Sequence, residues 1–133
     1  MALRIILVFS LFLSPVCFSA GSGALSVDRF IPEDVDTFFP NDDEVFPQES
    51  DFEIVNYLLM SSESGERQAL VTLKNTSVGN RLFKNSQILA LFADGRRRMP
   101  LTNTHDFEGR EIVSLILSFG VSRFPILEIY TKN

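Results

Sequence analysis

The chain has 133 residues, with 17 acidic against 12 basic side chains and one cysteine, Cys17. This length is enough for one domain of ordinary size with a substantial apolar core. A single cysteine excludes an internal disulfide and the zinc sites that need several thiolate ligands. The acidic balance disfavours nucleic acid as a partner.

Residues 1–20 have the three-part pattern of a secretory signal peptide. Arg4 precedes an apolar run over 5–13, and small residues begin at Ser19 and Ala20, where we expect cleavage. The apolar run is too short for a spanning helix, which takes about 20 residues. We therefore expect no transmembrane helix in the mature chain.

Cys17 allows an alternative interpretation, a bacterial lipoprotein signal in which this cysteine carries a lipid anchor. Val16 precedes it where a small residue is expected, and Pro15 is also unusual there, so we favour the simple secretory signal. Cleavage at Ala20 then removes the only cysteine. An exported domain without disulfides fits a periplasmic or secreted bacterial protein.

Residues 21–51 form an acidic N-terminal arm. Over 28–53 there are ten acidic residues and one arginine, a net charge of −9, whereas 54–133 has a net charge of +3. The prolines and the charge of the arm favour extended or disordered conformations.

The arm also contains seven large apolar residues, which are too many for an inert tether, and three of them are Phe38, Phe39 and Phe46. We favour packing of these side chains on the protein's own domain. The alternative is that the arm docks a protein partner, and the two are compatible if the docking is self-inhibitory.

Residues 52–133 have the pattern of strands separated by turn signals. The run 66–75 alternates, with Ala69, Val71 and Leu73 on one face, as in a pleated strand. No convincing amphipathic helix interrupts the pattern. We expect six strands, at 52–60, 66–75, 86–93, 96–102, 111–119 and 126–132.

Turn signals locate the connections between these strands. Asp94-Gly95 predicts a hairpin with a type I′ turn, and Pro100 confines the returning strand to a sheet edge. The run 86–93 is apolar on both faces, as in a central strand, and 103–109 is expected to be a loop. Asn75-Thr76-Ser77 matches a glycosylation acceptor, but we interpret so short a pattern as a turn.

The pattern predicts an all-β fold, an antiparallel two-sheet sandwich that is immunoglobulin-like and follows the extended acidic arm. The expected divisions are a signal peptide at 1–20, the arm at 21–51 and the β-sandwich domain at 52–133. We expect the following residues in or near the core: Val71, Leu73, Ile88, Ala90, Phe92, Val113, Leu115, Leu117, Ile126 and Ile129.

The run "GERQALVTLKNTSVGNRLFKNSQILALFADG", residues 65–95, loosely resembles small exported immunoglobulin-like bacterial domains. In those domains a strand ending in Asn-x-Ser precedes a longer strand that ends in Asp-Gly. The resemblance covers less than a quarter of the chain and rests on turn signals that are common in β-sandwiches. It implies an accessory module of the cell envelope and transfers no catalytic residue.

The sequence contains no strong catalytic signal. His105, Asp106 and Glu108 share one predicted loop, and one histidine with two carboxylates is a weak metal pattern, since structural zinc normally has four ligands. No nucleophile elbow, phosphate loop or dinucleotide fingerprint occurs. We expect no enzymatic activity, no cofactor and no metal.

Arg96, Arg97 and Arg98 are the most distinctive surface feature. One interpretation is an edge strand whose charge discourages aggregation. A second is a rim that receives the protein's own acidic arm or the acidic patch of another protein. A third is binding of an anionic polymer or lipid headgroup, although no aromatic platform accompanies the arginines.

We expect a non-enzymatic exported binding or accessory module of the bacterial envelope, which contacts a protein partner through its surface and its arm. The candidate contact residues are Arg96, Arg97, Arg98, Phe38, Phe39 and Phe46. Two alternatives are a surface or pilus-type subunit assembling by strand addition, and a small hydrolase or metal-dependent protein that uses His105.

Overall fold

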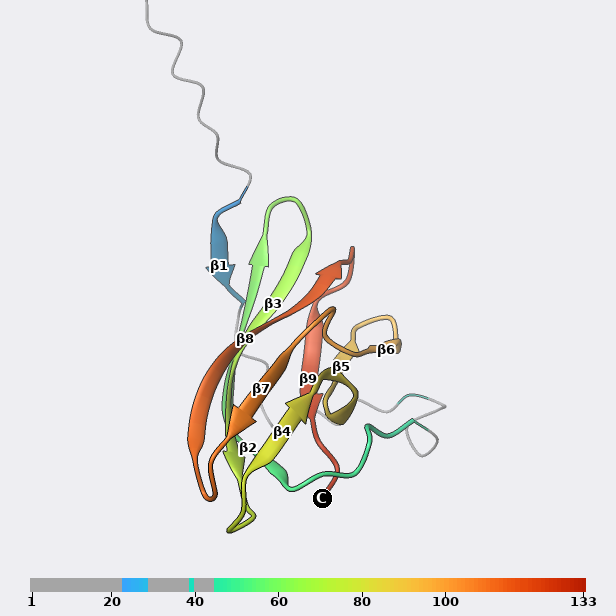
Figure 1. Ribbon diagram of the computed structural model, residues 1–133. Coiled ribbons are helices and arrows are strands. Elements are labelled where there is room, and N and C mark those ends of the chain that lie inside the picture. Colours follow the sequence, from blue (N-terminus) through green and yellow to red (C-terminus); the bar gives the residue numbers. More distant parts are fainter. Residues whose placement is uncertain (1–22, 29–38, 40–44) are drawn as a thin grey trace, which may run out of the picture.

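The computed structural model describes residues 23–28, 39 and 45–133, which form nine strands and one short 3-10 helix (Figure 1). The elements are β1 (Leu25–Val27), β2 (Phe52–Ser62), β3 (Glu66–Asn75), β4 (Arg81–Lys84), η1 (Asn85–Gln87), β5 (Leu89–Phe92), β6 (Arg97–Arg98), β7 (Thr104–Phe107), β8 (Ile112–Val121) and β9 (Ile126–Tyr130).

The strands form three antiparallel sheets. The largest has the order β1-β2-β3-β8, a second pairs β4 with β7, and a third has the order β6-β5-β9. Within the described ranges, no helix has the length and apolarity to cross a bilayer. The protein is all-β, as the sequence predicts.

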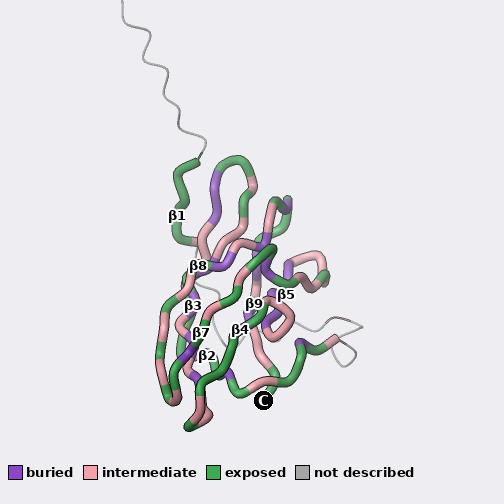
Figure 2. Tube along the Cα trace, in the orientation of Figure 1, coloured by how far each residue is buried: buried purple, intermediate pink, exposed green. Residues whose placement is uncertain are grey.

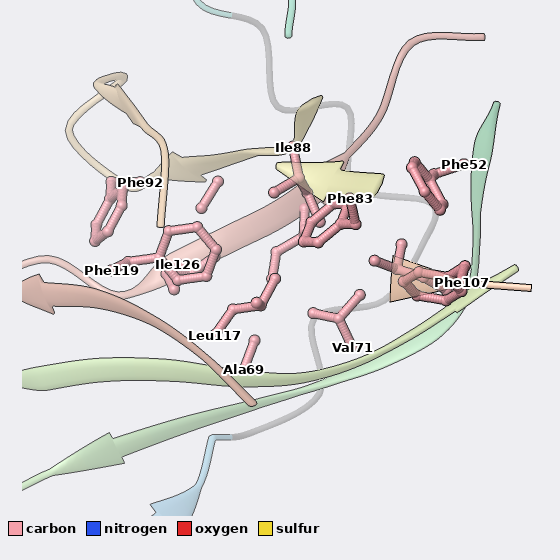
Figure 3. Close-up of a cluster of buried hydrophobic side chains, with 13 residues drawn as sticks. Phe52, Ala69, Val71, Phe83, Ile88, Phe92, Phe107, Leu117, Phe119 and Ile126 are labelled. Atoms are coloured by element: carbon pink, nitrogen blue, oxygen red, sulfur yellow. The ribbon is translucent and has the colours of Figure 1, made fainter. Parts of the chain in front are cut away.

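The hydrophobic core lies between the four-stranded sheet and the two smaller sheets. Alternation along β3 points Ala69, Val71 and Leu73 inward, and all three are fully buried. Figure 3 shows Ala69 and Val71 directed from their strand toward side chains of the facing sheets. Only one face of the four-stranded sheet therefore contributes to this core.

Aromatic rings from both layers fill much of this core. Five phenylalanines are fully buried: Phe52, Phe83, Phe92, Phe107 and Phe119. The centroids of Phe52 and Phe83 are 5.3 Å apart in an edge-to-face arrangement, and Phe52 lies 4.9 Å from Phe107. Such pairs add about 0.5–1.5 kcal/mol beyond the burial of their area, so β2, β4 and β7 are held together here.

The predicted core residues lie where the sequence places them. Eight of the ten are buried, and the other two, Val113 and Leu115, are partly buried and pack against the core. The central strand expected over 86–93 is found only over Leu89–Phe92, because Asn85–Gln87 form η1; β5 lies between β6 and β9 with all four residues buried.

Three predictions of local structure are wrong. The expected loop over 103–109 contains β7, which pairs with β4, and neither short strand was predicted. Four-residue strands with charged outward positions have too little apolar alternation for recognition. The strand expected over 96–102 is reduced to Arg97–Arg98, because Pro100 is buried and has no amide hydrogen for a ladder.

The Asp94-Gly95 hairpin forms, but not with the type I′ turn. Only Gly95 has a positive φ, 81°, since Arg110 is the one non-glycine residue with positive φ in the described chain. Gly95 N–H donates to Phe92 O at 2.9 Å, and Phe92 N–H donates to Arg96 O at 2.8 Å. These bonds enclose a three-residue loop that ends in a left-handed glycine.

Asn75 joins two turns from inside the protein. It is fully buried, and its Nδ2 donates to Gly79 O and Glu108 O, both at 2.9 Å. Its Oδ1 accepts from the Ser77 amide at 3.0 Å. The glycosylation pattern is therefore a turn, as predicted, with its amide inaccessible in the folded protein.

We expect Asn75→Ala to lower the free energy of unfolding by about 2 kcal/mol, because it removes a fully buried side chain and three hydrogen bonds, to Gly79 O, Glu108 O and the Ser77 amide. Urea denaturation followed by circular dichroism measures this loss. Asn80→Ala is the matched control, an exposed asparagine in the same turn that should change stability by less than about 0.5 kcal/mol. Equal losses in the two variants would contradict the assigned role of Asn75.

Candidate functional site

The three arginines of the predicted rim differ in their surroundings. Arg98 pairs with Ala90, a core residue, so its side chain lies on the inner face of β6. Its guanidinium lies 4.8 Å from the centroid of the Phe92 ring and donates to Val121 O at 3.1 Å. Arg98 thereby links the small sheet to β8 and has a structural role.

Arg96 is the arginine most available to a partner. Its side chain is 75% exposed, and Nε lies 3.5 Å from Oδ2 of Asp94, in an ion pair that solvent weakens. Arg97 is half-buried and pairs with Leu91 on the opposite face from Arg98, in agreement with strand alternation.

The loop between β8 and β9 lies beside this hairpin. Ala93 N–H donates to Pro125 O at 2.9 Å, and Ser122 N–H donates to Gly65 O at 2.9 Å, so three turns meet at one end of the molecule. The loop adds Arg123, which is also exposed.

Large apolar side chains are exposed at the same end. Leu101 packs against Gly120: a Cβ placed on Gly120 would lie 3.7 Å from Cδ2 of Leu101. We call this surface the basic end, and define it by the exposed residues Arg96, Met99, Leu101, Val121, Arg123 and Phe124. Positive charge beside apolar surface suits a ligand that is both acidic and aromatic.

Part of the acidic arm contacts this end. A Cβ placed on Gly95 would lie 2.8 Å from Cδ1 of Phe39 and 3.3 Å from Cε1, so the Phe39 ring packs directly on the hairpin turn. Phe38, the other aromatic residue predicted here, lies outside the described residues.

The last residues of the arm follow β9. Gln48 N–H donates to Ser86 O at 2.9 Å, and Glu49 forms a parallel bridge with Lys132. Phe46 does not join the basic end; the Lys132 ammonium lies 5.2 Å from its ring centroid. These contacts concern residues 45–50 alone, and packing of the rest of the arm on its own domain stays a prediction.

On the small sheet, Leu89 and Leu91 are buried although neither belongs to the core cluster. Tyr130, which pairs with Leu89, donates from its hydroxyl to Val45 O at 3.2 Å. Residues 45–50 thus contact the domain, and they are exposed or half-buried except for Pro47, which is buried (Figure 2).

His105 lies in β7 and not in a loop. It pairs with the buried Phe83, and its ring meets Phe107 edge-on at 5.1 Å between centroids. Asp106 points to the opposite face of the strand, since alternate residues do. Across residues 23–28, 39 and 45–133, no three His, Cys, Asp or Glu side chains are grouped as metal ligands.

Sequence reasoning missed the apolar part of the candidate surfaces. Val121 and Phe124 occur where the sequence predicts an ordinary strand end and turn, and their exposure depends on how the three turns meet. On the outer face of the four-stranded sheet, Leu58, Leu70 and Ile116 form a second exposed apolar group. The only sequence signal for this outer group is weak: the predicted strands have apolar residues on both of their faces.

No protein-family model, curated protein or solved structure matches this chain. Its function has to be inferred from the geometry of its own residues.

We expect Gly95→Ala to destabilise the protein by about 2 kcal/mol, through strain at a left-handed φ and displacement of the Phe39 ring. In a Phe39→Ala background the loss should fall to about 1 kcal/mol, because only the backbone strain remains. Denaturation of the four proteins in this double-mutant cycle gives the coupling. Identical losses in both backgrounds would show that Phe39 does not contact the turn in solution.

Proposed function

We propose that the chain is an exported, non-enzymatic binding module of the bacterial cell envelope. The observation that carries the proposal is the basic end, where Arg96 and Arg123 are exposed beside Leu101, Val121 and Phe124. The secretory pattern of residues 1–20 supports export to the periplasm or beyond.

We also infer that the domain is an immunoglobulin-like sandwich preceded by an acidic arm. The support is a core shared by one four-stranded sheet and two smaller antiparallel sheets. Such a domain presents turns at its two ends on a rigid scaffold. The basic end is one of these turn clusters, so its side chains are positioned by the sheets behind them.

The ligand that fits the basic end is an extended protein segment that alternates acids with aromatic residues. Exposed ion pairs are each worth only about 0–1 kcal/mol, whereas burying a phenylalanine ring stabilises by about 1.5–3 kcal/mol. The rings therefore provide most of the affinity, and the arginines direct encounter and register. The arm of the protein has this composition, and Phe39 contacts the turn next to Arg96.

We expect a fluorescent peptide with the sequence of residues 29–44 to bind the basic end of the processed protein. The protein's own arm should compete with the peptide for this site. Phe39→Ala in the protein should tighten binding at least about threefold, since the intramolecular competitor loses a ring. Arg96→Glu combined with Arg123→Glu should weaken binding about tenfold or more, because attraction becomes repulsion. Fluorescence anisotropy measures both changes.

Arg110→Glu is the matched control for charge. Arg110 is exposed in the turn before β8, whereas the basic end lies where β8 finishes, so the same charge reversal should leave peptide binding within about twofold. If the control weakens binding as much as the double variant, attraction is nonspecific and the proposed site is wrong. Loss of binding only in high salt, with no effect of Phe39→Ala, would contradict the role of the rings.

One observation favours a second candidate, a subunit that assembles by strand addition. β1 is an edge strand of three exposed residues, in register with the end of β2 through Val27 opposite Met60. Asp28 N–H donates to Leu59 O at 2.9 Å, and its carboxylate accepts from Ser61 Oγ at 2.8 Å. Because β1 adds nothing to the core, the same segment of a neighbour could replace it.

Strand addition predicts crossed disulfides between two single-cysteine proteins. Mixed and oxidised, Val27→Cys and Met60→Cys should give a covalent heterodimer, since the processed protein has no other cysteine. Val78→Cys replaces Val27→Cys in the control, because Val78 is highly exposed and follows the end of β3 that pairs with Phe52, whereas β1 pairs with the opposite end of β2. Equal yields in the two mixtures, together with a constant mass in light scattering, would eliminate this candidate.

A further inference from the structure

The outer face of the four-stranded sheet has a continuous apolar row. The pairing register places Leu58 opposite Leu70 and Leu70 opposite Ile116. Directly opposed residues in antiparallel strands point to the same face, and the inward positions of β3 are Ala69 and Val71. Leu58, Leu70 and Ile116, which we call the outer row, therefore lie together on the side away from the core.

The outer row is exposed in the described structure. Leu58 is 42%, Leu70 36% and Ile116 61% accessible. Single exposed leucines are common on protein surfaces and need no explanation. Three branched aliphatic side chains in contact range across three adjacent strands form a patch, and patches of this kind mark interaction surfaces.

The neighbouring rows make this face suitable for burial. On one side Thr72 and Ser114 are opposed, and their hydroxyls are hydrogen-bonded to each other at 2.8 Å. Each hydroxyl thus already has a partner if water is removed. On the other side of the outer row Met60, Gln68 and Ser118 are in register, and none of them is charged.

The charge of the face distinguishes between possible occupants. In the paired rows from Glu53 to Met60, the charged residues are Glu53 and Lys74, which lie opposite each other and have no net charge together. The whole chain has a net charge of −5, so the net charge of two copies opposes their association. Two copies of this face can therefore meet without like-charge repulsion. A strongly charged partner would gain no electrostatic attraction from a face that has no net charge.

We propose that the outer face of the four-stranded sheet is the contact surface for a second copy of this chain. Two sheets then pack face to face, with the outer row of each inserted between the side chains of the other, about 10 Å apart. Each subunit keeps its basic end free, because that surface is formed by turns at the ends of the strands and not by the sheet face.

The size of the face sets the strength of this dimer. The three long strands, spaced about 4.8 Å apart over about eight residues of about 3.3 Å, present a projected area of about 380 Å². A standard stable interface buries about 800 Å² per partner. We therefore expect a weak, concentration-dependent dimer with a dissociation constant on the order of 10 µM.

Sedimentation of the processed protein from about 1 to about 200 µM tests the proposal. The mean mass should rise from that of a monomer toward that of a dimer over this range. Leu70→Lys should raise the dissociation constant at least about tenfold, since it places a charge in the centre of the buried row. Ile116→Lys provides a second variant if Leu70→Lys fails to fold by circular dichroism.

Leu82→Lys is the matched control. Leu82 is an exposed leucine, 45% accessible, on β4 of the facing layer, opposite Asp106. The same substitution there should leave the dissociation constant within about twofold. A wild-type protein that stays monomeric throughout the range would overturn the proposal. This holds also if the monomer binds neutral lipid vesicles through Leu70. So would equal effects of the Leu70 and Leu82 substitutions.

Discussion

Burial of phenylalanine between two layers of strands is the interaction on which the rest of this structure depends. The residues that the structure describes include no cysteine for a disulfide, so the stability of this part of the chain has to come from packed apolar side chains. Phe52, Phe83 and Phe107 meet in edge-to-face and tilted contacts, and through them β4 and β7 are fixed to the large sheet. At the other end Phe92 lies under the Arg98 guanidinium, which reaches β8. The core thus determines where the hairpin and the turns of the basic end are placed.

A one-sided core has a consequence for the large sheet. Alternation gives each strand an inner and an outer face, and only the inner face contacts the two small sheets. In β3 the inner residues are small or aliphatic and fully buried, whereas Leu70 occupies an outer position where a polar residue would be expected of a solvated face. Thr72 and Ser114 next to it follow the polar expectation. The departure is centred on the outer row, and Ile112, opposite Lys74, is a further exposed apolar residue of the same face.

The sequence predicted the long strands and the core well because period-two alternation over ten residues leaves little ambiguity in β3. It failed for β4 and β7, whose four residues are held by tertiary contacts of Phe83 and Phe107. The turn at Asp94-Gly95 was assigned from a dipeptide, but the type depends on loop length, which the partner strand determines. For the candidate site, the arginines were visible in the sequence. Their division into a structural Arg98 and an exposed Arg96 was not, because it requires knowing which face of β6 meets the core.

The placement of Phe39 connects the arm to the basic end. Its ring contacts a glycine that has to remain without a side chain, both for its positive φ and for the space the ring occupies. In the proposed function, this contact makes the Phe39 ring an intramolecular competitor for the surface at the basic end. A partner segment of the kind that we propose would have to bind more tightly than this competitor. Weakly acidic or purely charged ligands would not displace the arm from the basic end. The arm would therefore restrict binding to ligands whose aromatic residues are in register with their acidic residues.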